Sequence, residues 1–244
     1  MGASLLVTGT DTAIGKTTVS CGMAAALHAS GRRVAVFKPC ETDCPNGPNG
    51  SLMPRDGTLL QFFSSSTVAI DDICPLRFAE PLAPLVAARR ARADVDVDAL
   101  HRRWERLDRS HDVTLVEGAG GLLVPLAEGV DFAELARRWN LPVLVVVGNR
   151  LGAINHALLT IATARSRGLD VIGYVVNTLE AEPTIAAATN AALLEELLGP
   201  PLAVVPYLPP LTATEAARAT LAATFAPLFD WDRLQERIAN EHRR

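Results

Sequence analysis

The chain has 244 residues, of which 49% are hydrophobic and 5% aromatic, and its formal net charge is −4. This length and apolar content fit one α/β domain over residues 1–244 better than two small domains. The mild acidity gives no electrostatic reason to expect a nucleic-acid partner, so small-molecule chemistry is the better expectation.

Two further features of the sequence bear on where the protein works. No apolar run reaches the roughly 20 residues of a membrane span, and the N-terminus lacks the basic flank and cleavage site of a secretory signal. The four cysteines form no CxxC pair and have no histidine at metal-ligand spacing. We therefore expect reduced thiols in a cytoplasmic protein that does not bind membranes.

Six short, β-branched runs alternate with segments of helical length. Their nearly continuous apolar character is typical of strands buried on both faces of a parallel sheet. The segments 17–31 and 153–168 each end in glycine, a common residue just beyond a helix C-terminus. The alternation predicts a doubly wound α/β fold that binds ligands beyond the carboxyl ends of its strands. The predicted strands are residues 4–9, 33–39, 112–118, 142–148, 170–177 and 202–208.

Two stretches between these elements are unusual. Residues 40–55 are rich in Pro, Gly and Asn, and a loop of this length in a compact domain is more often functional than not. We expect it to cover the carboxyl edge of the sheet. Residues 87–109 carry many charges at helical spacing, which predicts the solvated face of a helix.

The first predicted strand leads into "GTDTAIGKT", residues 9–17, which resembles a phosphate-binding P-loop. In such a loop, backbone N–H groups and the start of the following helix bind a phosphate anion. Lys16 is expected to contact the β- and γ-phosphates and the Thr17 hydroxyl to bind Mg²⁺. Five residues separate the two glycines where the common pattern has four, so Thr10 takes the place of the first glycine. A βα turn that contains GKT by chance is the alternative.

Only two of the 23 basic residues are lysines, Lys16 and Lys38. Because this chain uses arginine for its other positive charges, the two lysines indicate sites that need a compact ammonium group. A compositional bias is the alternative explanation. Both lysines follow predicted strands at the same edge of the sheet, and Thr42 follows Lys38 four residues later.

The predicted strand 112–118 has Glu117 next to its end, and glycines follow at 118, 120 and 121. An acidic residue after an apolar strand is the usual second Mg²⁺ anchor of P-loop proteins, and glycines allow the backbone to approach a ligand. Asp56, just past the long loop, is a third candidate for an oxygen ligand. Taken alone, Asp56 is better explained as the N-cap of a helix beginning at Gly57, and its ligand role depends on the family resemblance described below.

Four segments in this order, "GTDTAIGKT", "KPCET", "VEGAGG" and "RLGAINHALL", resemble the dethiobiotin synthetase family over residues 5–208. The resemblance implies a P-loop α/β fold, like that of nucleoside triphosphate hydrolases, with helices on both faces of a mostly parallel sheet. It also implies a homodimer. The implied reaction belongs to biotin biosynthesis: 7,8-diaminononanoate, CO₂ and ATP, with Mg²⁺, give dethiobiotin, ADP and phosphate.

The resemblance also implies roles for single residues. Lys38 matches the catalytic lysine, Thr42 a hydroxyl that contacts substrate, and Thr17, Asp56 and Glu117 the Mg²⁺ ligands. A later helix start matches the one that receives the substrate carboxylate from the other subunit. The implied nucleotide-binding residues are Thr12, Ala13, Ile14, Gly15, Lys16, Thr17, Asp56, Glu117, Gly118, Ala119, Gly120, Asn177, Thr178, Pro206, Tyr207 and Leu208, and the implied substrate-binding residues are Thr42, Gly152, Ala153, Ile154 and Asn155.

The chain departs from the family pattern in two places. Asp43 stands where the family usually has glycine, which adds a carboxylate near an anionic substrate. Residues 211–244 lie beyond the segments that carry the resemblance, and their helical pattern predicts a packing or dimer surface.

In the implied mechanism, a carbamate formed from one amine and CO₂ accepts the γ-phosphoryl group, and the neighbouring amine then closes the ring. Positioned cations suffice for this chemistry, and Lys16, Lys38 and Mg²⁺ supply them without a protein nucleophile.

Three other P-loop classes compete with this interpretation. A corrinoid diamide synthase usually carries a separate glutaminase domain, for which 244 residues leave no room. A ParA/MinD-like switch ATPase has a signature lysine where this chain has Asp11, and a GTPase needs an NKxD motif that the chain lacks. Turnover of ATP only in the presence of diamine and bicarbonate separates a ligase from a switch.

Overall fold

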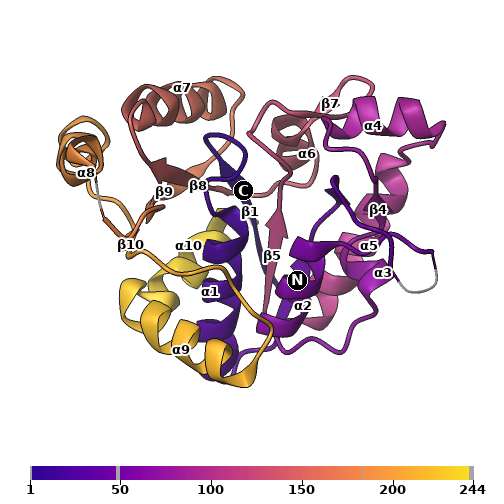
Figure 1. The fold of residues 1–244 in the computed structure, drawn as a ribbon, viewed down its shortest axis with the longest axis horizontal. Coiled ribbons are helices and arrows are strands. Elements are labelled where there is room, and N and C mark those ends of the chain that lie inside the picture. The colour runs from indigo at the N-terminus through magenta and orange to yellow at the C-terminus, as the bar shows by residue number, and fades with distance from the viewer. Residues whose placement is uncertain (1, 48–49, 183, 242–244) are drawn as a thin grey trace.

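The computed structural model describes residues 2–47, 50–182 and 184–241, and six parallel strands form its central sheet (Figure 1). All six strands predicted from the sequence are confirmed, although the last is shorter than predicted and leaves residues 206–208 beyond its end. The strand order is β10-β9-β8-β1-β5-β2, with every neighbouring pair parallel. The strands are β1 (Ala3–Gly9), β2 (Val34–Phe37), β5 (Val113–Glu117), β8 (Val143–Asn149), β9 (Val171–Thr178) and β10 (Ala203–Val205).

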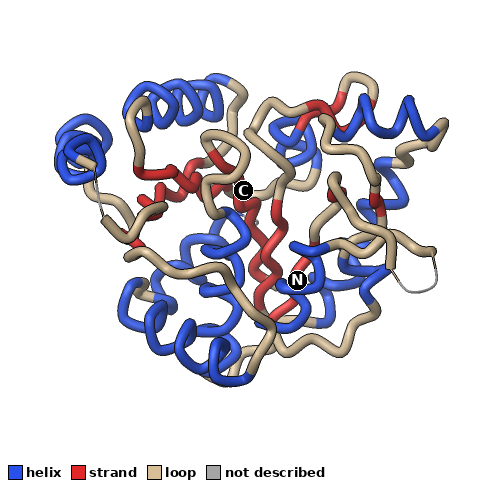
Figure 2. Tube along the Cα trace, in the orientation of Figure 1, coloured by secondary structure: helices blue, strands red, loops and turns tan. Residues whose placement is uncertain are grey.

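Helices cover both faces of this sheet, as Figure 2 shows. One face packs against α1 (Lys16–Ala29), α2 (Arg55–Phe63), α3 (Ile70–Ile73), α9 (Glu215–Phe225) and α10 (Trp231–Glu241). The other face packs against α4 (Pro84–Ala91), α5 (Val97–Ser110), α6 (Phe132–Arg138), α7 (Ala153–Ser166) and α8 (Ile185–Leu198). The predicted α/β fold with helices on both faces is therefore confirmed, and the predicted helices 17–31 and 153–168 correspond to α1 and α7.

The central strands are apolar on both faces because both faces are buried. Every residue of β1, β5 and β8 is buried, which explains why their sequences show no alternation of apolar and polar residues. Two small sheets lie outside the central one. Strands β3 (Cys40–Glu41) and β4 (Leu76–Arg77) pair in parallel, and β6 (Pro125–Ala127) pairs antiparallel with β7 (Val130–Asp131).

The sequence predicted a single helical face over the charged residues 87–109. In the structure these residues are divided between two helices, α4 and α5. Arg92 separates them in a left-handed conformation with φ 51°. A single helix cannot continue through that conformation. The predicted solvated face is present on α5, where Leu100, Trp104 and Leu107 face the core and the charged residues surround them.

The C-terminal segment packs against the first helix. Helix α9 lies along α1, and Phe225 contacts Gly22, where an added Cβ would stand 2.3 Å from the phenylalanine ring. The short 3₁₀ turn η1 (Ala226–Leu228) then leads to α10, whose Leu234 and Ile238 are buried in the same core. This agrees with the packing role predicted for residues 211–244.

The predicted long loop over residues 40–55 contains β3 and a bridge between Asn46 and Leu52, while residues 48–49 lie outside the described part of the chain. All four cysteines are free and buried, and burial raises the pKa of each thiol. Over the described residues, no helix has the length and apolar character needed to cross a membrane.

Candidate active site

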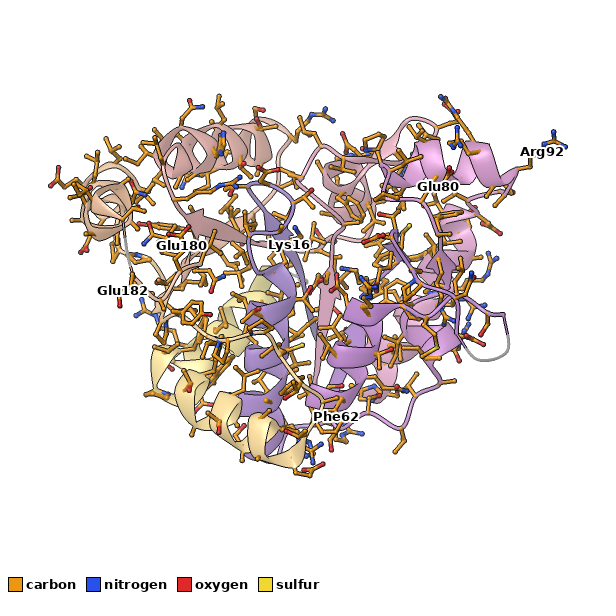
Figure 3. The ribbon with its side chains drawn as sticks, viewed as in Figure 1. Lys16, Phe62, Glu80, Arg92, Glu180 and Glu182 are labelled. Atoms are coloured by element: carbon orange, nitrogen blue, oxygen red, sulfur yellow. The ribbon has the colours of Figure 1, made fainter. Side chains whose placement is uncertain are left out.

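The loop between β1 and α1 leaves backbone donors at the start of α1. The helix begins at Lys16 after Gly15, which adopts φ 84° and provides no capping side chain. N–H groups at an uncapped helix start, together with the helix dipole, form a binding site for an anion. Figure 3 shows Lys16 at this end of α1, near the centre of the molecule.

Asn177, near the end of β9, contacts the loop between β1 and α1 with its side chain. Its side-chain amide donates a hydrogen bond to the Ile14 carbonyl at 3.0 Å, and the residue is only 4% exposed. Gly15 is required at this contact because an added Cβ would lie 2.1 Å from the Asn177 amide nitrogen. The structure thus places Asn177 as a brace for the phosphate loop.

A buried cluster of charges lies beside the loop, at the carboxyl ends of β2 and β5. Lys38 Nζ stands 2.6 Å from Glu117 Oε1 and 2.8 Å from Asp56 Oδ2. The Thr17 hydroxyl donates to the same Glu117 oxygen at 2.8 Å. The predicted catalytic lysine and the three predicted Mg²⁺ ligands are therefore in direct contact, although they come from four separate parts of the sequence.

The charges of this cluster determine its protonation. Burial alone would lower the pKa of Lys38, but the charges of Glu117 and Asp56 overcome this and raise it well above its ordinary value. Burial acts to raise the pKa of Asp56, but Lys38 holds that pKa below its ordinary value. Lys38 is therefore an ammonium ion and Asp56 a carboxylate at neutral pH.

Lys16 differs from Lys38 because it lies farther from the carboxylates. Its ammonium donates to the Asp11 carbonyl at 2.9 Å. Burial lowers the pKa of Lys16 to about 8, with Glu117 opposing the change. The charge of Lys16 is thus sensitive to an anion that binds nearby.

The oxygen atoms of the cluster suit Mg²⁺. Within the described residues, Glu117 Oε2 is buried and has no hydrogen-bond partner. A buried carboxylate oxygen of this kind is satisfied by a cation, and Mg²⁺ requires only one or two carboxylates besides phosphate oxygens and water. Glu117, Asp56 and the Thr17 hydroxyl therefore fit such an ion.

The alternative interpretation of Asp56 as a helix N-cap is wrong. Helix α2 begins at Arg55, so Asp56 lies within its first turn and Pro54 takes the N-cap position. The carboxylate of Glu41 caps the helix instead, because it accepts hydrogen bonds from the N–H groups of Asp56 and Gly57. The sequence does not point to Glu41, since a cap supplied from 15 residues upstream has no local signature.

A cleft of about 640 Å³ opens above these groups. The predicted residues that line it are Thr12, Ala13, Ile14, Gly15, Lys16, Thr17, Lys38, Thr42, Asp56, Ala119 and Gly120. Further lining residues that the sequence did not indicate are Glu41, Arg55, Pro81, Leu82, Ala83, Pro84 and Val124. The lining thus combines lysines, hydroxyls and glycines with apolar residues and with the carboxylates of Glu41, Asp43 and Asp56.

Several predicted site residues do not line this cleft. Glu117 lies fully buried beneath it, with 0% exposure. Gly118 follows Glu117 but is also not part of the lining, and Pro206, Tyr207 and Leu208 follow β10 at the surface, with Tyr207 40% exposed. Asn177 and Thr178 end β9. Adenine contacts of these residues remain predictions.

The predicted substrate-binding turn at the start of α7 also lies outside the cleft lining. Gly152 takes the N-cap position with φ 90°, and Gly152 and Asn155 are exposed, whereas Ala153 is buried. An ion pair between Arg150 and Asp11 joins this turn to the phosphate loop.

The backbone conformation of Asp43 explains why glycine is suited to this position. Its backbone is left-handed, with φ 62°, a conformation that glycine adopts freely and that Asp tolerates better than most residues. Its carboxylate is 3.9 Å from the Arg55 guanidinium at the mouth of the cleft. The added negative charge therefore has a cationic neighbour.

Comparison with known proteins identifies the family to which this chain belongs. A family model described as an AAA domain matches residues 3–215. The ATP-dependent dethiobiotin synthetase of Thermodesulfovibrio yellowstonii is 36% identical over 96% of this chain and 99% of its own length. The chain belongs to the dethiobiotin synthetase family.

Dethiobiotin synthetases from other bacteria give the same result. The enzyme of Nitrosospira multiformis is 39% identical over 85% of this chain and 89% of its own length, and that of Bacillus subtilis is 37% identical over 84% and 88%. The resemblance predicted from four sequence segments, and the enzyme class that it implied, are confirmed.

Solved structures of P-loop ATPases share the fold of this dethiobiotin synthetase. The MinC:MinD complex of Aquifex aeolicus matches with a TM-score of 0.54 and 14% identity, covering 93% of both chains. A ParA family ATPase from Chlorobium tepidum matches with a TM-score of 0.53 and 11% identity, covering 93% of this chain and 92% of the other. At these identities the likeness shows the fold alone.

Proposed function

We propose that this dethiobiotin synthetase closes the ureido ring of dethiobiotin from 7,8-diaminononanoate and CO₂ at the expense of ATP, as a step of biotin biosynthesis in the cytoplasm. The observation that carries the proposal is the convergence of Lys16, Lys38, Thr17, Asp56 and Glu117 at one edge of the sheet. Two cations and a phosphate loop beside a cleft of about 640 Å³ suit the transfer of a phosphoryl group between two anions.

The reaction divides into three steps. An amine nitrogen of the substrate attacks CO₂ and loses a proton, which gives a carbamate. A carbamate oxygen attacks the γ-phosphorus of ATP, and ADP leaves. The second amine attacks the carbamate carbon, phosphate leaves, and the loss of a proton completes the ring.

The residues of the chain contribute binding and charge to these steps. The N–H groups at the start of α1 and the Lys16 ammonium bind the β- and γ-phosphates. Lys38 remains protonated and stabilises negative charge on the phosphoryl group as it passes to the carbamate. Thr42, in the cleft wall, donates its hydroxyl to the diamine substrate or its carbamate.

Thr17, Asp56 and Glu117 would hold Mg²⁺ together with phosphate oxygens of the nucleotide. The ion would neutralise charge on the phosphates during transfer. The unpartnered Glu117 Oε2 and the two carboxylates around Lys38 support this assignment.

We further propose that the enzyme acts as a homodimer. The turn at Gly152–Asn155 lies outside the cleft lining of its own subunit, which supports a role in the site of a second copy. The N-terminus of α7 would then bind the carboxylate of the diamino acid. Leu151 and Leu159, 85% and 59% exposed beside this turn, supply apolar surface for the contact.

Product stoichiometry tests the proposed reaction. Purified protein is supplied with ATP, Mg²⁺, 7,8-diaminononanoate and bicarbonate, and dethiobiotin and ADP are measured with each component omitted in turn. The proposal predicts equal amounts of dethiobiotin and ADP, and no ADP without the diamine. Steady release of ADP in the absence of the diamine would instead indicate a switch ATPase.

A further inference from the structure

The start of helix α2 depends on an acceptor from another part of the chain. Pro54 occupies the N-cap position and has no side chain that accepts a hydrogen bond. The first N–H groups of a helix need acceptors, which an N-cap side chain commonly provides. Here Glu41 Oε1 accepts from the Asp56 N–H at 3.0 Å, and Glu41 Oε2 accepts from the Gly57 N–H at 2.9 Å.

Glu41 is itself held firmly in place. Its backbone belongs to β3, and its carbonyl accepts a hydrogen bond from the Phe78 N–H at 2.9 Å. The residue is 5% exposed and lies between β3 and α2, at the edge of the cleft that it helps to line. A fixed strand therefore sets the position of the first turn of α2.

This first turn carries one of the site residues. Asp56 is bound through its backbone N–H to Glu41 and through its side chain to Lys38, at 2.8 Å. Lys38 precedes Glu41 by three residues on the same segment. One short segment therefore fixes Asp56 at two points, the backbone and the carboxylate.

We propose that Glu41 is a positioning residue for Asp56. Its carboxylate holds the first turn of α2 in the place from which Asp56 would contact the Mg²⁺ ion bound with the nucleotide. The inference rests on the proposed function, which assigns Asp56 to Mg²⁺. A cap with only a structural role would stabilise α2 without changing how strongly Mg²⁺ promotes nucleotide binding.

The two oxygen atoms of Glu41 allow a graded test. Glu41→Gln keeps the length of the side chain but presents one acceptor oxygen and an amide group, which cannot accept from the second N–H. Glu41→Ala removes both acceptors. Asp96→Ala is the matched control, because Asp96 caps α5 through the Ala99 N–H and does not line the cleft.

Two measurements read out the effect. Calorimetry gives the affinity for ADP with and without Mg²⁺, and hydrogen exchange reports the amides of Asp56 and Gly57. We expect the enhancement of ADP affinity by Mg²⁺ to fall about tenfold in Glu41→Ala, since loss of an outer-shell partner costs 10- to 100-fold in metal affinity, and to fall less in Glu41→Gln. Exchange at α2 should accelerate in both variants. Asp96→Ala should accelerate exchange at α5 only.

Asp56→Ala distinguishes a failure of the positioning role of Glu41 from a failure of the assignment of Asp56 to Mg²⁺. If it abolishes the Mg²⁺ enhancement while Glu41→Ala behaves like the wild type or like Asp96→Ala, the positioning role is overturned and the proposed function stands. If Asp56→Ala retains the full enhancement, the assignment of Asp56 to Mg²⁺ fails, and the role of Glu41 fails with it. Should Glu41→Ala not fold, the same criteria apply to Glu41→Gln.

Discussion

Lys38 and Glu117 form a buried ion pair, with 2.6 Å between Nζ and Oε1 and side chains that are 3% and 0% exposed. Lys38 also forms an ion pair with Asp56, so one ammonium contacts two carboxylates. Two carboxylates thus share one ammonium in the Lys38–Asp56–Glu117 cluster, and within the described residues the second oxygen of Glu117 has no hydrogen-bond partner. A cation bound at that oxygen would satisfy it.

Replacing Lys38 should destabilise the fold in a way that Mg²⁺ reverses. Lys38→Ala leaves a buried carboxylate without its cation, which typically costs about 3–5 kcal/mol. We expect a lower melting temperature, and a larger rise of that temperature on adding Mg²⁺ than the wild type shows. Thermal unfolding over a Mg²⁺ titration measures this. Arg33→Ala, which removes an exposed ion pair with Asp112, is the control. If Mg²⁺ raised the melting temperature of Lys38→Ala no more than that of the wild type, the prediction would be wrong.

Nucleotide binding should take up a proton at alkaline pH. The pKa of Lys16 is about 8 in the free protein, and bound phosphate raises the pKa of a neighbouring ammonium. At pH 8.5 Lys16 is largely neutral before binding and charged afterwards, whereas at pH 6.5 it is charged in both states. Calorimetry of ADP binding in buffers of different ionisation enthalpy should detect uptake at pH 8.5. Lys16→Arg should abolish the uptake, because arginine stays charged.

Asn177 allows a test of whether it braces the loop or contacts adenine. If Asn177 supports the loop, Asn177→Ala should weaken binding of ATP and of inorganic triphosphate alike, by about fivefold, since a buried hydrogen bond contributes about 1 kcal/mol. A residue that contacts only the base would affect ATP and leave triphosphate unchanged. Competition binding with the two ligands distinguishes these outcomes.

The carboxylate of Asp43 should slow the capture of anions. Asp43→Gly suits the left-handed backbone and removes a negative charge from the mouth of the cleft. We expect a lower KM for ATP, which is an anion, at low ionic strength and a smaller difference in high salt, because exposed charges are screened. Asp43→Asn is the control for the charge, since Asn also tolerates this conformation. Equal KM values for all three proteins in low salt would refute the effect.

The sheet and the charged cluster were predictable because both depend on local signals. Buried parallel strands have continuous apolar sequences; Lys38 follows one such strand and Glu117 is the last residue of another. Strands that run parallel end at the same edge, so residues far apart in the sequence were expected to meet there. The contact of Lys38 with Glu117 is the direct result.

Other parts of the site depend on tertiary contacts that no local pattern encodes. Glu41 caps a helix that begins 14 residues later, and the lining residues between Pro81 and Pro84 reach the cleft only through the path of the chain. Arg92 ends α4 in a left-handed conformation, which a sequence rule assigns to glycine rather than arginine.

The proposed role of Lys38 is to act on the transferring phosphoryl group, without being needed to bind the nucleotide. ADP affinity and dethiobiotin formation are therefore measured in Lys38→Ala and the wild type, both at saturating Mg²⁺. We expect ADP affinity within about threefold and dethiobiotin formation reduced about 100-fold or more. Dethiobiotin formation at the wild-type rate would contradict this role.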